Sequence, residues 1–292
     1  MARQAGRLRL AQCIDLVRKE DPAHYLCCTH LKPEHRSSAF TFHALNLELD
    51  QVAKKTSKAQ FASLKFKWWT DAINKVCSES DAIPSHPVVL SLPELVNQSR
   101  TSKYFLSKLV QGKLDKAENP LKVVKTLETL EEHAESVYSS LFYLILESSQ
   151  VEDSDCLHAA SHMGKGVGLT LLLKSIPEDA LVDKVYLPTD LCLQSKMSYG
   201  EVTKGINSDN LSEVVYQVAA RAKNHLDEAR RRYENMPNNH KPFLLPCIPA
   251  LQYLERLERV GFAPFTPELH DNALTALQLQ VKVGWSNFIG KM

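Results

Sequence analysis

The 292-residue sequence predicts an all-α protein. Apolar residues recur with helical spacing from end to end, and no alternating strand pattern of useful length is present. Glycine is scarce, at 10 residues, which argues against a turn-rich β architecture. The breaks between the periodic segments are short, as expected between packed helices. We therefore expect a single domain over residues 1–292, built from roughly ten helices.

The composition narrows the class of protein. Lys and Arg number 35 against 34 Asp and Glu, so the chain lacks the basic excess of a nucleic-acid-binding protein. Its seven cysteines include no C-x-x-C pair, which favours a reducing compartment over a disulfide framework. No run of 18 apolar residues indicates a membrane-spanning helix.

The first segment allows two interpretations. Arg3, Arg7 and Arg9 precede the first acid, Asp15, so residues 1–7 have the composition of the end of an Arg-rich transit segment. Alternatively, the segment is a first amphipathic helix that turns inward Leu8, Leu10, Ile14 and Leu16. The sequence leaves both open.

The helix expected over residues 36–55 carries a polar stripe among apolar residues. His43, Asn46, Asp50 and Lys54 recur at a spacing that puts all four on one face. Such a stripe faces either a polar cavity or solvent. The following helix, 61–77, is expected to bury the face formed by Phe61, Leu64, Trp68, Ala72 and Val76, with Trp69 and Ile73 beside it.

The segment 126–149 is acidic at its start and apolar later, the direction that a helix dipole favours. In the next helix, 158–179, three glycines at 164, 166 and 168 serve close helix packing or access to a cavity. Pro177 ends or kinks that helix and presents Glu178 and Asp179 at its end. Three more helices follow, within 208–237, 247–262 and 268–288.

Two stretches carry a family resemblance. The first is Arg36 followed by "FHALNLELDQVAK", and the second is "GLTLLLKSIPEDALVDKVYLP", which keeps Leu-Thr, Glu-Asp, a basic residue and Tyr-Leu-Pro at the family's spacings. With these stretches the chain resembles the squalene/phytoene synthase family from about residue 8 to about residue 288. The resemblance implies an all-α class I isoprenoid synthase fold around a central cavity.

The resemblance also implies which residues once bound ligand. In active members, aspartates on two facing helices hold Mg²⁺ ions that bind an allylic diphosphate. Here Asp50 remains, but Gln51 and Lys54 replace the next two acids, and Ser175 replaces the leading acid of the second motif. Lys54 can instead pair with Asp50, four residues earlier. We therefore expect no catalytic residue, metal or cofactor. The expected vestigial diphosphate and metal site consists of Glu48, Asp50, Lys174, Ser175, Glu178 and Asp179. The cavity-lining candidates are His43, Asn46 and Lys54.

Further stretches, "ALNLELDQV", "KFKWWTDAI" and "HPVVLSL", resemble a degenerate branch of this family. Its members are assembly factors for mitochondrial respiratory complex I. The resemblance implies a non-enzymatic protein that acts early in building the membrane arm, attached peripherally to the matrix side of the inner membrane. Its partners would be assembly intermediates or other assembly factors, and not nucleic acid.

An alternative is a protein that still takes an isoprenoid diphosphate or another lipid. It would be a binding protein or a prenyltransferase with a reduced metal site, using Asp50, Glu48, Asp179 and Lys174.

Overall fold

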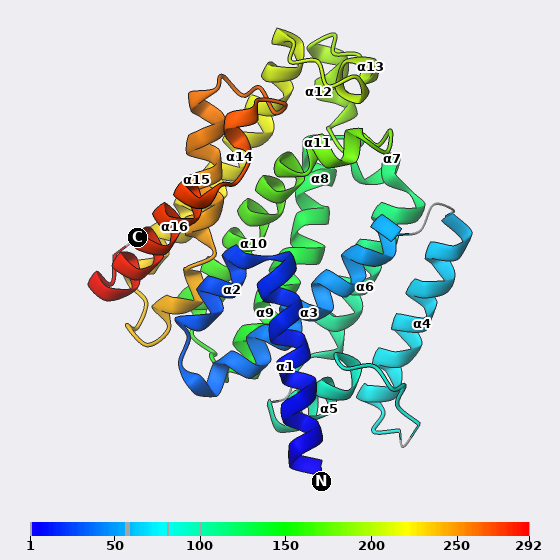
Figure 1. Ribbon diagram of the computed structural model, residues 1–292, viewed down its shortest axis with the longest axis vertical. Coiled ribbons are helices and arrows are strands. Elements are labelled where there is room, and N and C mark those ends of the chain that lie inside the picture. Colours follow the sequence, from blue (N-terminus) through cyan, green and yellow to red (C-terminus); the bar gives the residue numbers. More distant parts are fainter. Residues whose placement is uncertain (1, 56–58, 81, 100, 292) are drawn as a thin grey trace.

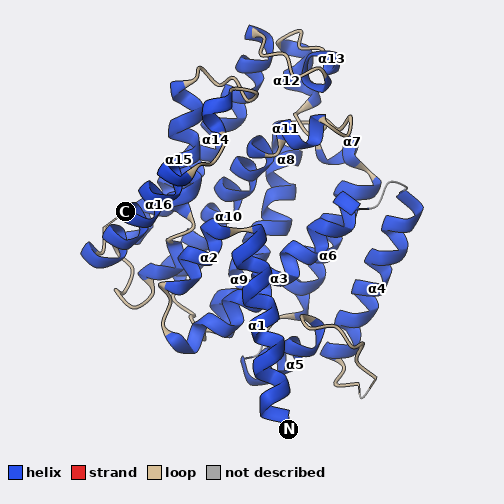
Figure 2. Cartoon of the chain, viewed as in Figure 1, coloured by secondary structure: helices blue, strands red, loops and turns tan. Residues whose placement is uncertain are grey.

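The computed structural model describes the backbone of residues 2–55, 59–80, 82–99 and 101–291, and side chains within 4–52, 61–80, 82–97 and 101–291. Figures 1 and 2 show helices joined by short loops, and no strand occurs in these ranges. The predicted all-α class is confirmed.

The helices of twelve or more residues are α1 (Ala2–Glu20), α3 (Pro33–Lys55), α4 (Ala59–Cys77), α6 (Lys103–Glu118), α10 (Ser154–Lys174), α14 (Asp209–Tyr233), α15 (Cys247–Arg259) and α16 (Ala273–Ile289). The shorter α-helices are α2 (Pro22–Thr29), α5 (Leu92–Ser99), α7 (Pro120–Val123), α8 (Leu127–Ala134), α9 (Ser140–Ser148), α11 (Ile176–Ala180), α12 (Thr189–Gln194) and α13 (Tyr199–Thr203). Three 3₁₀ turns, η1 (Val89–Ser91), η3 (Lys241–Leu244) and η4 (Pro267–Leu269), and one π-helical turn, η2 (Glu135–Ser139), complete the described elements.

Helix α10 lies at the centre, between α14 on one side and α8 with η2 on the other. Its glycines make these approaches close. A β-carbon at Gly164 would collide with the backbone of Ser139 on η2, and one at Gly166 would lie 2.6 Å from Leu226 on α14. Of the two roles predicted for these glycines, close packing of helices is the one that they serve, on both sides of α10.

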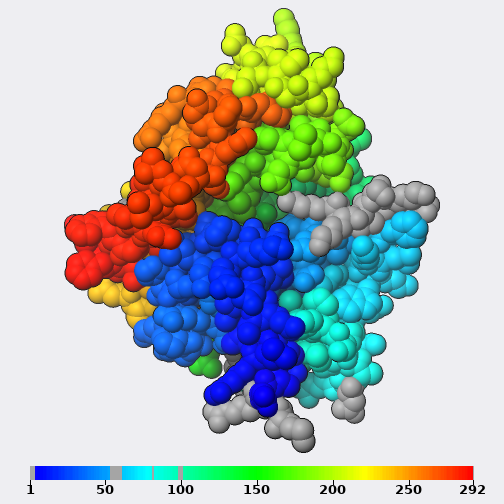
Figure 3. Space-filling view, viewed as in Figure 1, coloured from blue at the N-terminus to red at the C-terminus, as the bar shows by residue number. Residues whose placement is uncertain are grey.

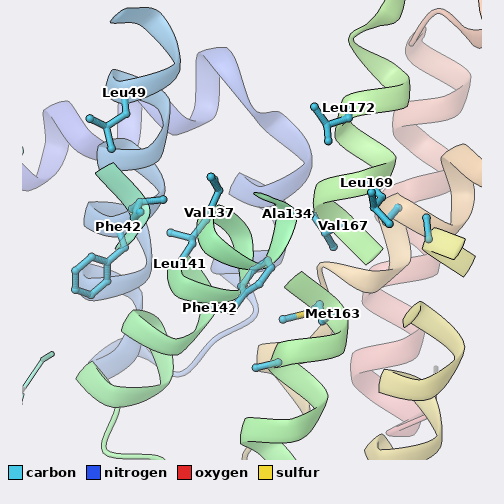
Figure 4. Close-up of a cluster of buried hydrophobic side chains, with 14 of the residues drawn as sticks. Phe42, Leu49, Ala134, Val137, Leu141, Phe142, Met163, Val167, Leu169 and Leu172 are labelled. Atoms are coloured by element: carbon cyan, nitrogen blue, oxygen red, sulfur yellow. The ribbon is translucent and has the colours of Figure 1, made fainter. Parts of the chain in front are cut away.

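The core fills the space between α3, η2, α9 and α10, as Figure 4 shows. Phe42 and Leu49 come from α3, Val137 and Leu141 from η2 and α9, and Met163 from α10. All five side chains are fully buried, and each such burial contributes about 1.5–3 kcal/mol relative to exposure. This core fixes α3 and α10, the two helices that carry the family motifs.

The buried face of α4 differs from the predicted one. Ala72 and Val76 are buried as expected, but Phe61, Leu64 and Trp68 are exposed. The buried face consists instead of Ala62, Phe66, Trp69, Ile73 and Val76. α4 lies at the edge of the molecule, where it packs mainly on α6 (Figure 1), so only a narrow face is covered. Both candidate stripes are apolar, and periodicity alone did not separate them.

Helix α1 packs along α3 and includes the predicted first amphipathic segment. Leu10, Ile14 and Leu16 pack against the core as expected. Leu8 does not, since it is exposed, and the fully buried positions of α1 are Cys13 and Val17.

Candidate functional site

The first motif helix, α3, places Asp50 against a lysine of α6. Lys113 Nζ lies 2.5 Å from Asp50 Oδ1, and the Lys113 side chain is only 6% exposed against 35% for Asp50. Asn46 Nδ2 donates to the other oxygen, Asp50 Oδ2, at 3.5 Å. Asp50 is thus neutralised from within the protein. The predicted partner, Lys54, has a side chain outside the described residues.

A second lysine of α6, Lys116, lies between the two motifs. Its Nζ lies 4.0 Å from the centre of the Tyr186 ring, in the Tyr-Leu-Pro segment that follows the second motif. Burial lowers the pKa of Lys116, while the carboxylates of Asp179 and Asp50 act in the opposite direction. Carboxylates from both motifs therefore act on one ammonium group.

The second motif ends at the junction of α10 and α11. α10 ends at Lys174 and α11 begins at Ile176, with Pro177 in its first turn, as the sequence predicted. Ser175 Oγ donates to Asp179 Oδ2 at 2.7 Å. Ser175, at the position where the resemblance expects an acid, thus supplies a donor to the carboxylate of Asp179.

Two neutral groups complete the surroundings of the lysines. Lys113 Nζ lies 5.1 Å from the centre of the Tyr138 ring, on the π-helical turn η2. Burial, helped by Asp50, raises the pKa of Tyr138 well above its usual value. Burial and the charges of Lys116 and Lys113 lower the pKa of His133 to about 3. Both groups are uncharged near neutral pH. We call Asp50, Asp179, Lys113 and Lys116 the lysine cluster.

The lysine cluster does not fit a Mg²⁺ ion. Mg²⁺ requires hard oxygen ligands in near-octahedral geometry, with carboxylates free to coordinate it. Both oxygens of Asp50 accept hydrogen bonds, and one of them contacts the ammonium of Lys113. A divalent cation beside Asp50 would have to displace a buried lysine of the same sign.

The other predicted site residues lie apart from the lysine cluster. Lys174 Nζ pairs with Asp271 at 2.6 Å. Glu48 faces His86, 3.8 Å away, in a surface groove shared with Gln51 and the two tryptophans of α4. Glu178 is exposed on α11. The structure therefore gathers Asp50 and Asp179 around Lys116, with Ser175 bonded to Asp179, and leaves the other three outside.

His43 lies toward the opposite end of the α3 stripe, in an apolar pocket. Its ring lies 4.9 Å from that of His24, and burial lowers its pKa to about 3. The pocket, which Phe142 and Met163 also line, has a free volume of about 20 Å³. Ligand pockets usually offer about 300–1,000 Å³, so apolar side chains already fill this one.

Sequence reasoning missed the two lysines of α6. The buried stripe of that helix runs through Leu106, Leu109 and Val110 and reaches Lys113 at the next inward position. A lysine in an apolar stripe was therefore the available signal, since buried charges need a partner.

The arrangement of helices matches that of a solved structure. A crystal structure of a dehydrosqualene synthase in complex with ligand superimposes with a TM-score of 0.82, at 16% identity, covering 97% of both chains. A family model, squalene/phytoene synthase, matches residues 17–285. The chain belongs to the squalene/phytoene synthase family.

Within this family the chain is similar to proteins named complex I assembly factor 6. The Bos taurus NADH dehydrogenase (ubiquinone) complex I, assembly factor 6 is 31% identical over 92% of this chain and 80% of its own length. The Drosophila melanogaster homolog is also 31% identical, over 86% of this chain and 75% of its own.

Proposed function

We propose that this chain is a non-enzymatic assembly factor for mitochondrial respiratory complex I, acting early in the biogenesis of the membrane arm. The similarity to relatives carrying that name, over 92% of this chain, supports the process. The ion pair between Lys113 and Asp50 supports the non-enzymatic role. It places a buried cation of the protein against the carboxylate that a metal-dependent synthase would need for Mg²⁺.

The proposed partners are complex I assembly intermediates or other assembly factors, met on the matrix side of the inner membrane. None of the described helices is both long and apolar enough to cross a bilayer. Peripheral attachment is the form of membrane association that we propose.

The role in assembly is tested by deleting the gene and measuring assembled complex I on native gels. We expect loss of the complex, restored by the wild-type chain and by Asp179→Asn. Asp179 is partly exposed and bonded to Ser175, and such a carboxylate contributes only about 0–1 kcal/mol. Normal complex I in the deleted cells would exclude this function.

The non-enzymatic role is tested with the purified protein. We expect no Mg²⁺-dependent condensation of farnesyl or geranylgeranyl diphosphate, measured against a blank without protein. Turnover that disappears in Asp50→Ala would show that the lysine cluster still supports chemistry.

A second candidate function is metal-free binding of an isoprenoid diphosphate. The observation that favours it is the pair of lysines, Lys113 and Lys116, beside the remaining acids, since ammonium groups bind phosphate oxygens. Calorimetric titration with farnesyl diphosphate in EDTA tests it. Binding that is lost in Lys116→Met and kept in Lys122→Met, on exposed α7, would support this candidate.

A further inference from the structure

The C-terminal helix α16 carries a large apolar face that no described part of the chain covers. Figure 3 shows this helix, in red, along one edge of the molecule. Six apolar side chains, each 41–83% exposed, belong to it: Leu274, Leu277, Val281, Trp285, Phe288 and Ile289. We call this surface the α16 seam. A monomeric soluble protein rarely exposes so many neighbouring large apolar residues without a binding role.

The opposite side of α16 holds the helix firmly in place. Val283 is fully buried in a small cluster with Cys27, Leu245 and Ile248. Asn272 caps the helix start through a reciprocal bond with Thr275. The seam is therefore a fixed outer face of an anchored helix.

The spacing of the seam is that of a helix that packs on another helix. Leu274, Leu277, Val281, Gly284 and Phe288 follow one another at alternating intervals of three and four residues. This is the a/d spacing that places side chains of one helix into the gaps of a partner helix.

Gly284 lies beside the seam and has no side chain to fill the space there. A β-carbon at Gly284 would meet no atom within 4 Å, whereas one at Gly112, Gly164, Gly166 or Gly168 would meet atoms within 3 Å. A helical glycine weakens a helix relative to alanine, and no atom of the described residues occupies the space at Gly284. A close partner would use it.

The seam is also electrically neutral. Lys282, the charged residue of α16, pairs with Glu255 of α15 at 2.8 Å. A neutral, apolar seam matches another neutral, apolar seam better than an anionic membrane surface, which attracts a basic face. An aromatic side chain offers about 150–250 Å², so Trp285 at 63% and Phe288 at 83% exposed present roughly 300 Å² by themselves, against about 800 Å² per partner in a standard interface.

We propose that the α16 seam binds the α16 seam of a second copy of this chain, antiparallel about a two-fold axis at Val281. Phe288, seven residues after Val281, then meets Leu274 of the second copy, and Trp285 meets Leu277. Each aromatic side chain opposes a leucine, and Lys282 opposes the neutral Gln280. Such a self-complementary interface closes after two copies.

Sedimentation of the purified full chain between about 1 and 100 µM tests the proposal. We expect a species of about twice the 32.9 kDa of one chain. Leu277→Glu should raise the dissociation constant more than about 100-fold, because it places a charge in an apolar interface. Leu64→Glu on α4, at 63% exposed against 56% for Leu277, is the matched control and should remain dimeric.

A wild-type chain that stays monomeric at 100 µM would overturn the proposal. Flotation of that monomer with vesicles of phosphatidylcholine and cardiolipin would assign the seam to a membrane surface instead. A dimer that survives both Leu277→Glu and Val281→Glu would place the interface elsewhere. Circular dichroism of each variant separates loss of dimer from loss of fold.

The antiparallel register has its own test by oxidative cross-linking. Val281→Cys lies on the two-fold axis and should cross-link to itself, whereas Leu64→Cys should not. Phe288→Cys should cross-link only when mixed with Leu274→Cys. Self cross-linking of Phe288→Cys would indicate parallel helices and overturn the antiparallel register.

Discussion

Lys113 Nζ and Asp50 Oδ1 lie 2.5 Å apart, although 63 residues separate them in the chain. The lysine is nearly fully buried, and the carboxylate is its anionic partner. Removing either partner would leave the other charge unpaired, and an unpaired buried charge is strongly unfavourable.

Removing one member of this pair should therefore cost more than removing both. We expect Asp50→Asn to lower the free energy of unfolding by about 1–3 kcal/mol, less than the about 3–5 kcal/mol of a fully buried pair because Asp50 is 35% exposed. The double variant Asp50→Leu/Lys113→Met should lose less than either single change. Urea unfolding followed by circular dichroism measures all four proteins. Additive losses would mean that the two side chains do not interact.

The adjacent tryptophans of α4 provide a matched pair. Trp69 is buried, and Trp69→Ala should cost about 3–5 kcal/mol through lost contacts and a residual cavity. Trp68 is 41% exposed, so Trp68→Ala should cost less than half as much. In cells, Trp69→Ala should lower the amount of folded protein and with it complex I, as immunoblots would show. Equal losses in both variants would contradict the burial pattern of α4.

Buried neutral histidines should make the protein sensitive to acid. Burial lowers the pKa of His43 and of His133 to about 3, from an ordinary value of 6.5. Between these values the unfolded chain binds protons that the folded chain does not. Stability is therefore complete above pH 6.5 and falls as the pH drops toward 3, by up to about 1.4 kcal/mol per pH unit for each group.

The histidine variants test this directly. In unfolding curves taken between pH 4 and 7, His133→Gln should reduce the slope of stability against pH. The exposed His158 supplies the control, His158→Gln, which should leave the slope unchanged. An unchanged slope in His133→Gln would show that His133 is not kept neutral in the folded state.

Close packing at Gly164 should not tolerate a single methyl group. Gly164→Ala places a β-carbon on the backbone of Ser139, which cannot rotate away, so we expect a loss of about 1–3 kcal/mol. Gly200 is also helical, but its added β-carbon would make only an ordinary contact, 3.5 Å from Ser198. Gly200→Ala should be neutral or slightly stabilising. Thermal unfolding of both variants measures the two effects. A tolerated Gly164→Ala would show that α10 and η2 can separate.

The helices were predictable because their signals are local. Capping residues and apolar periodicity lie within each segment, and Pro177 marks the end of α10 in the sequence itself. Which of two apolar faces is buried is not a local property. On α4 the choice between Trp68 and Trp69 depends on where α6 lies, and the wrong face was predicted.

The lysine cluster was predictable only in part. The resemblance expects acids at positions 51 and 175, where the sequence has Gln51 and Ser175, and it matches Asp50 and Asp179. The cation that pairs with Asp50 comes from α6, whose position against α3 follows from tertiary packing. The sequence offered Lys54, four residues after Asp50 on the same helix, as the partner of Asp50. The described partner of Asp50 is instead Lys113, which lies on α6.

The pair of Lys113 and Asp50 also bears on how the chain responds to metabolism. A synthase that binds substrate and metal in its folded state gains stability from them, about 2.7 kcal/mol at a ligand concentration one hundred times the dissociation constant. Under the proposed non-enzymatic function, a fold in which Lys113 is the counter-ion of Asp50 should gain no such stability from these ligands. The quantity of this protein should then stay constant when isoprenoid precursors or magnesium are depleted, while a catalytically active relative declines.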